Sequence, residues 1–371
     1  MEAMAAVTET PVSTLPKLGP LEKVYVAWLA GGSCDGCSIS VLGATNPSVE
    51  TLLAGQAPGL PQLVLFHTAL SYETGADYIN QLKKCESGEY FPLVVVLEGS
   101  VPNEDLAGDG FWIAIGEENG KPITTAEWLR RLCPKAAATI AIGTCATWGG
   151  VPEAEHNPTG AMGLMDYLGP DYRSAFGLPI VNIPGCAPIG DNFVEVVASL
   201  LLFLQGLTPL PEFDELGRPA WIYGETVHRG CPRAGYYEEG VFAKEYGDKE
   251  CLVEKGCWGP VVQCNMASRG AINGIGGCMQ MGGVCIGCTM PGFPDKFSPL
   301  FAKPPGAEIS ALVAKRLTGA LIKPMRAITQ RDKNRSIRWN EKVPSGWGPK
   351  AKPFGLDRVV NYFYNKVQKS R

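Results

Sequence analysis

The feature that most constrains the fold of this chain is residues 228–288, where seven cysteines and one histidine lie within sixty-one positions. In sequence order these residues divide into two sets of four. The first set is His228, Cys231, Cys251 and Cys257, and the second set is Cys264, Cys278, Cys285 and Cys288. Soft thiolate ligands in groups of four are typical of metal centres, so this part of the chain is expected to fold around metal.

Disulfide bonds are the other structural use of many cysteines. The chain has thirteen cysteines, an odd number, so they cannot all pair within one chain. Residues 1–20 contain one lysine, no pair of arginines and no apolar core, which indicates a flexible arm and neither a secretory nor a twin-arginine signal. We therefore expect a cytoplasmic protein, and in a reducing compartment such cysteine spacing favours metal ligation.

Tetrahedral sulfur ligation suits both a zinc ion and an iron–sulfur cluster. A zinc ribbon usually places two close pairs of ligands at even spacing. Here one ligand is a histidine, the first set extends over thirty residues, and the second set ends in a single C-x2-C pair, Cys285 and Cys288. This irregular spacing favours a larger cluster with four separate corners, and a zinc-stabilised scaffold stays open as the alternative.

The composition is that of a globular protein, with 45% hydrophobic and 19% charged residues, and 371 residues are enough for two domains. The net charge of −4 provides no general basic field for nucleic acid. The most apolar later segment, residues 193–207, is fifteen residues long and contains Glu195 and Gln205. It is too short and too polar to be a transmembrane segment, so we expect a core helix.

Short apolar runs alternate with stretches of helical pattern between residues 24 and 207. The runs are VYVAWLA (24–30), PQLVLFH (61–67), PLVVVLE (92–98), AATIAIG (137–143) and LPIVNIP (178–184). Continuous runs rich in Val and Ile are typical of strands buried on both faces, and helices are expected at residues 125–131 and 192–207. This alternation predicts an α/β fold with a doubly wound parallel sheet.

The loops after these strands are expected to carry the remaining chemistry, because functional groups in such sheets lie at the carboxyl ends of the strands. Glu98 ends the third run. Cysteines follow the first, fourth and fifth runs, and we expect them to converge on one crevice: Cys34, Cys37, Cys145 and Cys186.

The glycine-rich loop after the first run, GGSCDGCS, could instead bind phosphate. It lacks the GxGxxG spacing and a Walker lysine, so nucleotide binding has weak support, and a flavin at the same place would leave the cysteines without a use. A single cysteine is also commonly a small buried hydrophobic residue. We expect no special role for Cys85 and Cys133, which lie outside the three sets.

The order of the motifs along the chain resembles that of the small, electron-transferring subunit of [NiFe] hydrogenases. The motifs are CDGC (34–37), LEGSVP (97–102), GTCATWGG (143–150), NPTGA (157–161), PGCAP (184–188), HRGCPR (228–233) and VCIGC (284–288). The resemblance covers residues 24–299 with every motif in order. Without an export signal and with a long C-terminal extension, the chain most resembles the soluble, oxygen-tolerant, actinobacterial-type hydrogenases that take up hydrogen with high affinity.

The resemblance implies a flavodoxin-like domain at residues 21–210 with a proximal cluster, a loop-rich iron–sulfur domain with few regular elements at 211–300 with a medial and a distal cluster, and a basic extension at 301–371. It also implies a separate large subunit that contains the nickel–iron centre and splits hydrogen. This chain would pass electrons from the proximal to the medial to the distal cluster and on to an external acceptor. The alternative is an iron–sulfur subunit of a quinone-linked respiratory complex, which has a similar sheet domain but does not need residues 228–288.

The resemblance also assigns candidate ligands by position. The proximal [4Fe–4S] set is Cys34, Cys37, Cys145 and Cys186, the distal [4Fe–4S] set is His228, Cys231, Cys251 and Cys257, and the medial set is Cys264, Cys278, Cys285 and Cys288. Cys278 lies where many relatives carry proline and a [3Fe–4S] cluster, so a [4Fe–4S] medial cluster is predicted, with [3Fe–4S] as the alternative. Asp35 is a further candidate ligand of the proximal cluster, since a carboxylate can replace a thiolate. The other interpretation of Asp35, and of Glu98, is an acid that caps a loop.

The C-terminal extension is basic, with eleven Lys or Arg and two acids in residues 315–352. A run of charge is usually a solvated surface. Here a predicted terminal helix with one apolar face follows it, formed by Leu356, Val359, Val360, Phe363 and Val367. We expect this face to assemble heterodimers into a dimer or higher oligomer, and peripheral binding to an anionic membrane surface is the alternative.

Deletion of residues 303–371 is expected to lower the mass of the purified complex, measured by light scattering, because it removes the apolar face that would join copies. The iron content per heterodimer should not change, since every candidate ligand precedes residue 289. An unchanged mass together with lost membrane association would support the surface-binding alternative.

Overall fold

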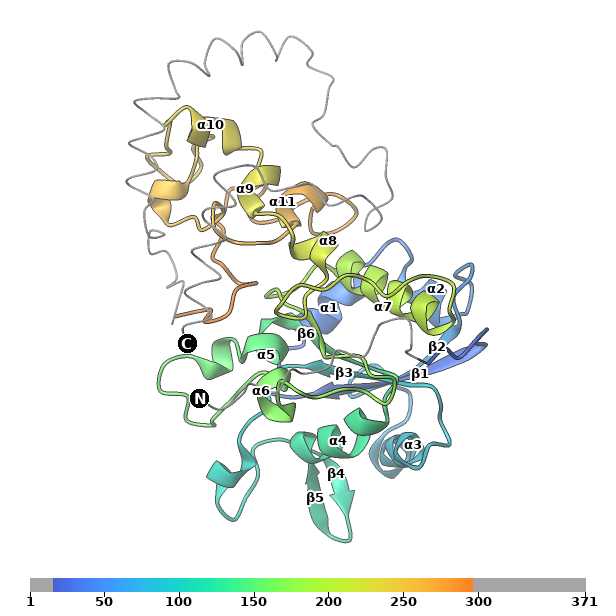
Figure 1. The fold of residues 1–371 in the computed structure, drawn as a ribbon. Helices are drawn as coiled ribbons and strands as arrows, with labels where there is room; N and C mark the ends of the chain where they lie inside the picture. Colours follow the sequence, from blue (N-terminus) through green and yellow to red (C-terminus); the bar gives the residue numbers. More distant parts are fainter. Residues whose placement is uncertain (1–15, 296–371) are drawn as a thin grey trace, which may run out of the picture.

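The computed structural model describes residues 16–295, which form two parts (Figure 1). The first part is a parallel sheet with helices on both faces, and the second part, from α8 onward, consists of short helices and long loops. The predicted extension at 301–371 lies outside the described residues, as does the predicted arm apart from residues 16–20. The domain boundaries themselves stay a prediction.

The central sheet has five strands in the order β2-β1-β3-β6-β7, and every neighbouring pair is parallel. The strands are β1 (Lys23–Ala30), β2 (Gln62–His67), β3 (Leu93–Glu98), β6 (Ala138–Ile142) and β7 (Val181–Ile183). Counted within this sheet alone, the order is 2-1-3-4-5, which is the flavodoxin-like arrangement. The predicted fold class is therefore confirmed, and each of the five apolar runs is a strand.

Two hydrophobic cores hold the layers together, one on each face of the sheet. Successive residues of a strand point to opposite faces, so Val96 of β3 packs in one core and Leu97 packs in the other. One face is covered by α1 (Gly36–Leu42), α2 (Val49–Leu53) and α7 (Gly190–Leu204), and the other by α3 (Gly75–Ser87), α4 (Thr125–Leu132) and α6 (Leu164–Leu168). The central strand β3 is buried along its whole length because both of its faces are covered.

Two elements differ from the sequence-based expectation. The helix expected at residues 192–207 is α7, which ends at Leu204 because Gly206 adopts a φ of 79°, a left-handed conformation that commonly ends a helix. No apolar run predicts the antiparallel hairpin of β4 (Ala114–Glu118) and β5 (Lys121–Thr124), because most of its residues are at least partly exposed. The first part also contains α5 (Gly143–Trp148) and the 3-10 turns η2 (Glu104–Ala107), η3 (Cys133–Lys135) and η4 (Val151–Glu153).

The second part has few regular elements, as expected. They are α8 (Ala220–Tyr223), α9 (Val227–Gly230), α10 (Ala234–Glu238), the turn η5 (Val253–Lys255) and α11 (Met266–Arg269). Its small core buries Trp258 and Met290 together with Cys257 and Cys285. Candidate metal ligands are therefore part of the core that holds these loops together.

Polar side chains join the two parts. Asn192 on α7 and Asn265 exchange two amide hydrogen bonds, of 2.8 and 3.0 Å. Arg269 on α11 donates to both carboxylate oxygens of Glu195 on α7, at 2.7 and 2.8 Å. These contacts hold α11 against α7. Within residues 16–295, no helix combines the length and the apolar character needed to cross a bilayer.

Candidate metal centres

The proximal set lies at the carboxyl end of the sheet. Cys34 follows β1, Cys37 lies on α1, Cys145 lies on α5, and Cys186 follows β7. In a flavodoxin-like sheet, the ends of β1 and β3 form the switch point at which such folds bind ligands. Loops that are far apart in sequence therefore deliver their cysteines to one edge of the sheet.

The thiols leave no room for a side chain on the neighbouring loops. A Cβ atom on Gly143 would lie 2.3 Å from Cys37 Sγ, and one on Gly150 would lie 2.8 Å from Cys145 Sγ. Both glycines also have a positive φ, of 84° and 60°, which other residues rarely adopt. Glycine at these two positions thus allows α5 and its flanking loop to approach the thiols closely.

The proximal thiols disfavour one another's ionisation. Burial is the largest cause that raises the pKa of Cys145, to about 11, and the charges of Cys186 and Cys34 act in the same direction. The pKa of Cys37 is raised well above its ordinary value, first by burial and then by Glu98 and the other three thiols. Thiolates in this arrangement require a compensating positive charge, which is what a metal centre supplies.

Glu98, at the end of β3, is buried beside the proximal set and accepts hydrogen bonds on both carboxylate oxygens. Oε1 accepts from the backbone N–H groups of Cys37 and Ser38, at 3.0 and 3.2 Å. Oε2 accepts from the Trp28 indole N–H at 3.1 Å and from the Ser38 hydroxyl. Glu98 therefore caps the first turn of α1 and holds Cys37 against the end of β3.

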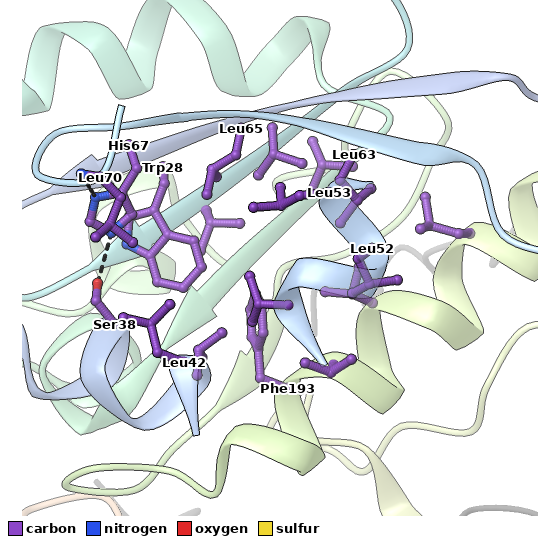
Figure 2. A pocket seen from close by; sticks show the side chains of 18 residues that line it. Trp28, Ser38, Leu42, Leu52, Leu53, Leu63, Leu65, His67, Leu70 and Phe193 are labelled. Atoms are coloured by element: carbon purple, nitrogen blue, oxygen red, sulfur yellow. Dashed lines mark hydrogen bonds between the residues drawn. The ribbon is translucent and has the colours of Figure 1, made fainter. Parts of the chain in front are cut away.

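Figure 2 shows Trp28, Ser38 and His67 together at one end of an apolar pocket. Nδ1 of His67 accepts from two backbone N–H groups of the following loop, at 3.0 and 3.2 Å. In the neutral ring the proton is therefore on Nε2, which donates to Ser38 Oγ at 2.8 Å. Burial lowers the pKa of His67, in agreement with a neutral ring. A chain of hydrogen bonds thus runs from His67 through Ser38 to Glu98.

Asp35 lies directly before α1 with a φ of 59°, and its side chain is exposed. Its side chain makes no capping hydrogen bond to α1, whereas Glu98 accepts hydrogen bonds from backbone N–H groups of α1. A role of Asp35 as a metal ligand stays a prediction.

The four residues of the distal set line one cavity in the second part: His228, Cys231, Cys251 and Cys257. Burial raises the pKa of Cys251 to about 12, and the charges of Cys257 and Cys231 also raise it. Burial lowers the pKa of His228 to about 4, so at neutral pH its ring is uncharged and keeps a lone pair for a metal. A neutral imidazole and three thiols are a suitable donor set for iron or zinc.

The four residues of the medial set line another cavity: Cys264, Cys278, Cys285 and Cys288. Walls of this cavity come from both parts of the molecule, since Pro184 and Asn192 line it together with Tyr223. Cys278 shares the cavity with the other three cysteines, which a fourth ligand requires. Burial raises the pKa of Cys264 to about 11.

The three sets contact one another in series. Thr144 on α5, the residue before Cys145 of the proximal set, donates its hydroxyl to the carbonyl of Cys288 in the medial set, and Gly185 and Ala187, on either side of Cys186, line the medial cavity. The backbone N–H of Cys285, in the medial set, donates to Cys257 Sγ of the distal set at 3.3 Å. The medial set therefore lies between the other two sets and contacts both.

The two remaining cysteines lie away from these centres. Cys85 and Cys133 are 1% and 0% exposed in the core on the α3 and α4 side of the sheet. In the part of the chain that the structure describes, no group of three or more His, Cys, Asp or Glu side chains is arranged to hold a single metal ion.

Sequence reasoning missed four polar residues that support the sets: Ser38, His67, Thr144 and Arg218. Ser38 and Thr144 could have been found because each is next to a candidate ligand in sequence. His67 could have been found because it ends a predicted strand. Arg218 had no such signal, since it lies ten residues before His228 and far from every other candidate ligand in sequence.

In comparisons with known proteins, the two parts of the chain match two different families. Residues 34–200 match the family described as NADH ubiquinone oxidoreductase, 20 Kd subunit, and residues 223–301 match the family that describes the C-terminal part of the NiFe/NiFeSe hydrogenase small subunit. The chain is 33% identical over 291 residues to the periplasmic [NiFeSe] hydrogenase small subunit of Desulfomicrobium baculatum, covering 76% of this chain and 87% of that one. It is 34% identical over 274 residues to the hydrogenase-2 small chain of Escherichia coli K12, covering 72% and 67%.

Among solved structures, the actinobacterial-type NiFe-hydrogenase from Ralstonia eutropha H16 aligns with a TM-score of 0.80 at 48% identity, over 88% of this chain and 96% of that one. A flavodoxin-like domain followed by a cysteine-rich domain of the hydrogenase type defines a redox-enzyme subunit. More specifically, the chain belongs to the family of [NiFe] hydrogenase small subunits, which are parts of heteromeric hydrogenases with a large subunit as partner.

Replacement of Glu98 by Gln is expected to destabilise the protein by about 1–3 kcal/mol. Three of the four groups that face the carboxylate are N–H donors that cannot accept, so the new amide N–H₂ would face at least one of them whichever way it turns. The measurement is the thermal unfolding midpoint of the purified heteromeric complex at one scan rate. Glu117→Gln, on the exposed side of the β4–β5 hairpin, is the control. Equal midpoints for the two variants would contradict the role assigned to Glu98.

Proposed function

We propose that this chain relays electrons from hydrogen oxidation in the large subunit, through three iron–sulfur clusters, to an external acceptor. The observation that carries the proposal is that the twelve candidate ligands come together as three sets of four, two of which line one cavity each. The large subunit supplies the nickel–iron chemistry. This chain fixes the positions of the electron carriers.

The residues present fit iron–sulfur clusters. Buried thiols with raised pKa values need positive charge beside them before they can be thiolates, and clusters supply it. Backbone N–H groups also point at the sulfur atoms: Met266 N–H lies 3.4 Å from Cys264 Sγ, and Arg233 N–H lies 3.4 Å from Cys231 Sγ. Such hydrogen bonds stabilise negative charge on sulfur and help to set the reduction potential.

The contacts between sets support the order of transfer. The proximal set adjoins the medial set through the contact of Thr144 with Cys288, and the medial set adjoins the distal set through Cys285 and Cys257. Short separations favour transfer of single electrons, and buried walls exclude water from the path. Proximal to medial to distal is therefore the order we propose.

The respiratory alternative has one observation in its favour, the match of residues 34–200 to the 20 Kd subunit family. The proximal set alone would serve such a subunit. The match of residues 223–301 to the hydrogenase family lies where the distal and medial sets are found, and this favours the hydrogenase function.

We also propose a hydrogenase group, an oligomeric state and a cellular location for this protein. The structural relative described as actinobacterial-type supports assignment to the oxygen-tolerant, high-affinity uptake group. Assembly of the heterodimer into a dimer or higher oligomer, and a cytoplasmic location, stay predictions, and one relative is described as periplasmic.

Chemical analysis of the purified complex tests the clusters. We expect on the order of twelve iron atoms in this chain, with a similar amount of acid-labile sulfide, if every cluster has four irons. The chain expressed alone should not reduce a dye with hydrogen, because the nickel–iron centre belongs to the large subunit. Zinc without sulfide would show a structural scaffold instead, and absence of a nickel-containing partner after purification would favour the respiratory alternative.

Replacement of Cys278 by Ser tests the medial cluster. Loss of the fourth thiolate should convert a four-iron cluster into a three-iron cluster, which gives a characteristic EPR signal in the oxidised complex. Cys85→Ser removes a buried thiol outside every set and should leave the spectrum unchanged. A three-iron signal already present before mutation, and unaffected by Cys278→Ser, would show that Cys278 is not a ligand.

A further inference from the structure

Arg218, in the loop before α8, is a charged side chain that is 3% exposed. Its guanidinium lies 5.3 Å from the ring centre of Tyr223, and Nε donates to Asp214 Oδ2 at 2.8 Å. The two remaining nitrogens approach Gln263 Oε1 and, at 3.9 Å, Met290 Sδ. A cation buried this fully is costly unless its surroundings compensate it, so its place in the fold needs an explanation.

The contacts of Arg218 hold the two chain segments that carry medial ligands. Gln263 directly precedes Cys264, and Met290 follows Cys288 by two residues. The same segments are joined to each other by the Thr289 hydroxyl, which donates to the Gln263 carbonyl at 2.8 Å. The guanidinium therefore lies between the segments that deliver Cys264 and Cys288 to the medial cavity.

Tyr223 extends this contact toward the proximal set. Its ring lines the medial cavity, and its hydroxyl donates to the carbonyl of Pro184 at 2.6 Å, two residues before Cys186. The positive charge of Arg218 stands over this ring. Arg218 thus lies on the medial side of the boundary between the proximal and the medial sets.

The countercharge of Arg218 is less buried than Arg218 itself. The side chain of Asp214 is 24% exposed, against 3% for Arg218, so water screens the carboxylate more than the guanidinium. Arg218 contacts Gln263, which directly precedes Cys264, and Met290, which follows Cys288 by two residues, so its charge lies beside the medial set. The pair therefore presents net positive potential to the medial site.

We propose that the positive charge of Arg218 raises the reduction potential of the medial cluster. The medial site then draws an electron from the proximal site. This rests on the proposed function. The step moves one electron from a reduced proximal cluster to an oxidised medial cluster, with no bond formed and no proton transferred. A reduced cluster carries one more negative charge, and a fixed cation in a water-poor site stabilises that charge.

The test is an EPR-monitored redox titration of the purified heteromeric complex, with the medial signal identified as the one that changes in Cys278→Ser. Arg218→Gln should shift the medial potential downward, and Arg218→Lys, which keeps the charge, should shift it less. Asp214→Asn should shift the potential upward, because it removes the countercharge while its amide oxygen can still accept from the N–H groups of Leu216 and Arg218. Arg131→Gln, which removes an arginine of the α4 ion pairs on the other face of the sheet, should cause no shift.

The sign of the shifts separates the proposal from a purely structural role. If Arg218 only holds the segments together, Arg218→Lys and Arg218→Gln should behave alike and Asp214→Asn should leave the potential unchanged, and either result would overturn the proposal. If Arg218→Gln fails to assemble, Asp214→Asn alone decides the test. An upward shift of the medial potential in this variant supports the proposal, and no shift or a downward shift overturns it. Absence of a medial iron–sulfur signal in the unmodified complex would instead refute the proposed function.

Discussion

The structure depends on the burial of thiol groups that cannot easily ionise without a metal. Burial raises the pKa of Cys145, Cys251 and Cys264 to between about 11 and 12, so a cluster-free fold would hold these groups as neutral thiols. Positive charge from a bound metal centre would reverse this preference, and metal binding would then contribute directly to folding. The second part depends on this most, because Cys257 and Cys285 belong to its small core.

The sheet provides the rigid side of the arrangement. Its flavodoxin-like strand order brings the ends of β1 and β3 together. Glu98 accepts hydrogen bonds from Trp28 and from the backbone of Cys37, which holds the first turn of α1 in place. Only glycine at position 143 allows α5 to lie this close to Cys37, because a side chain there would collide with the Cys37 sulfur. The loop-rich second part is then anchored on this edge through contacts such as Thr144 with Cys288, so the position of the medial set follows from the position of the proximal set.

Much of this arrangement was predictable, for identifiable reasons. Strands buried on both faces require continuous apolar runs, and β3 and β6 could therefore be located from sequence. Cysteines at strand ends could be grouped because parallel strands end at one edge. The β4–β5 hairpin could not be located, since its short, partly exposed strands leave no apolar pattern. The end of α7 depended on the backbone of one glycine, Gly206, which a hydrophobic pattern does not report.

The sequence by itself determined the class of fold and the family, because strand periodicity and the order of motifs are properties of the chain, and it predicted three sets of candidate ligands. Only the tertiary structure decided which sets touch, that Cys278 shares a cavity with the other medial cysteines, and that Glu98 rather than Asp35 caps α1. It also decided the surroundings of Arg218, whose contacts come from residues four to seventy-two positions away. Long-range contacts of this kind arise from packing, and no short sequence pattern encodes them.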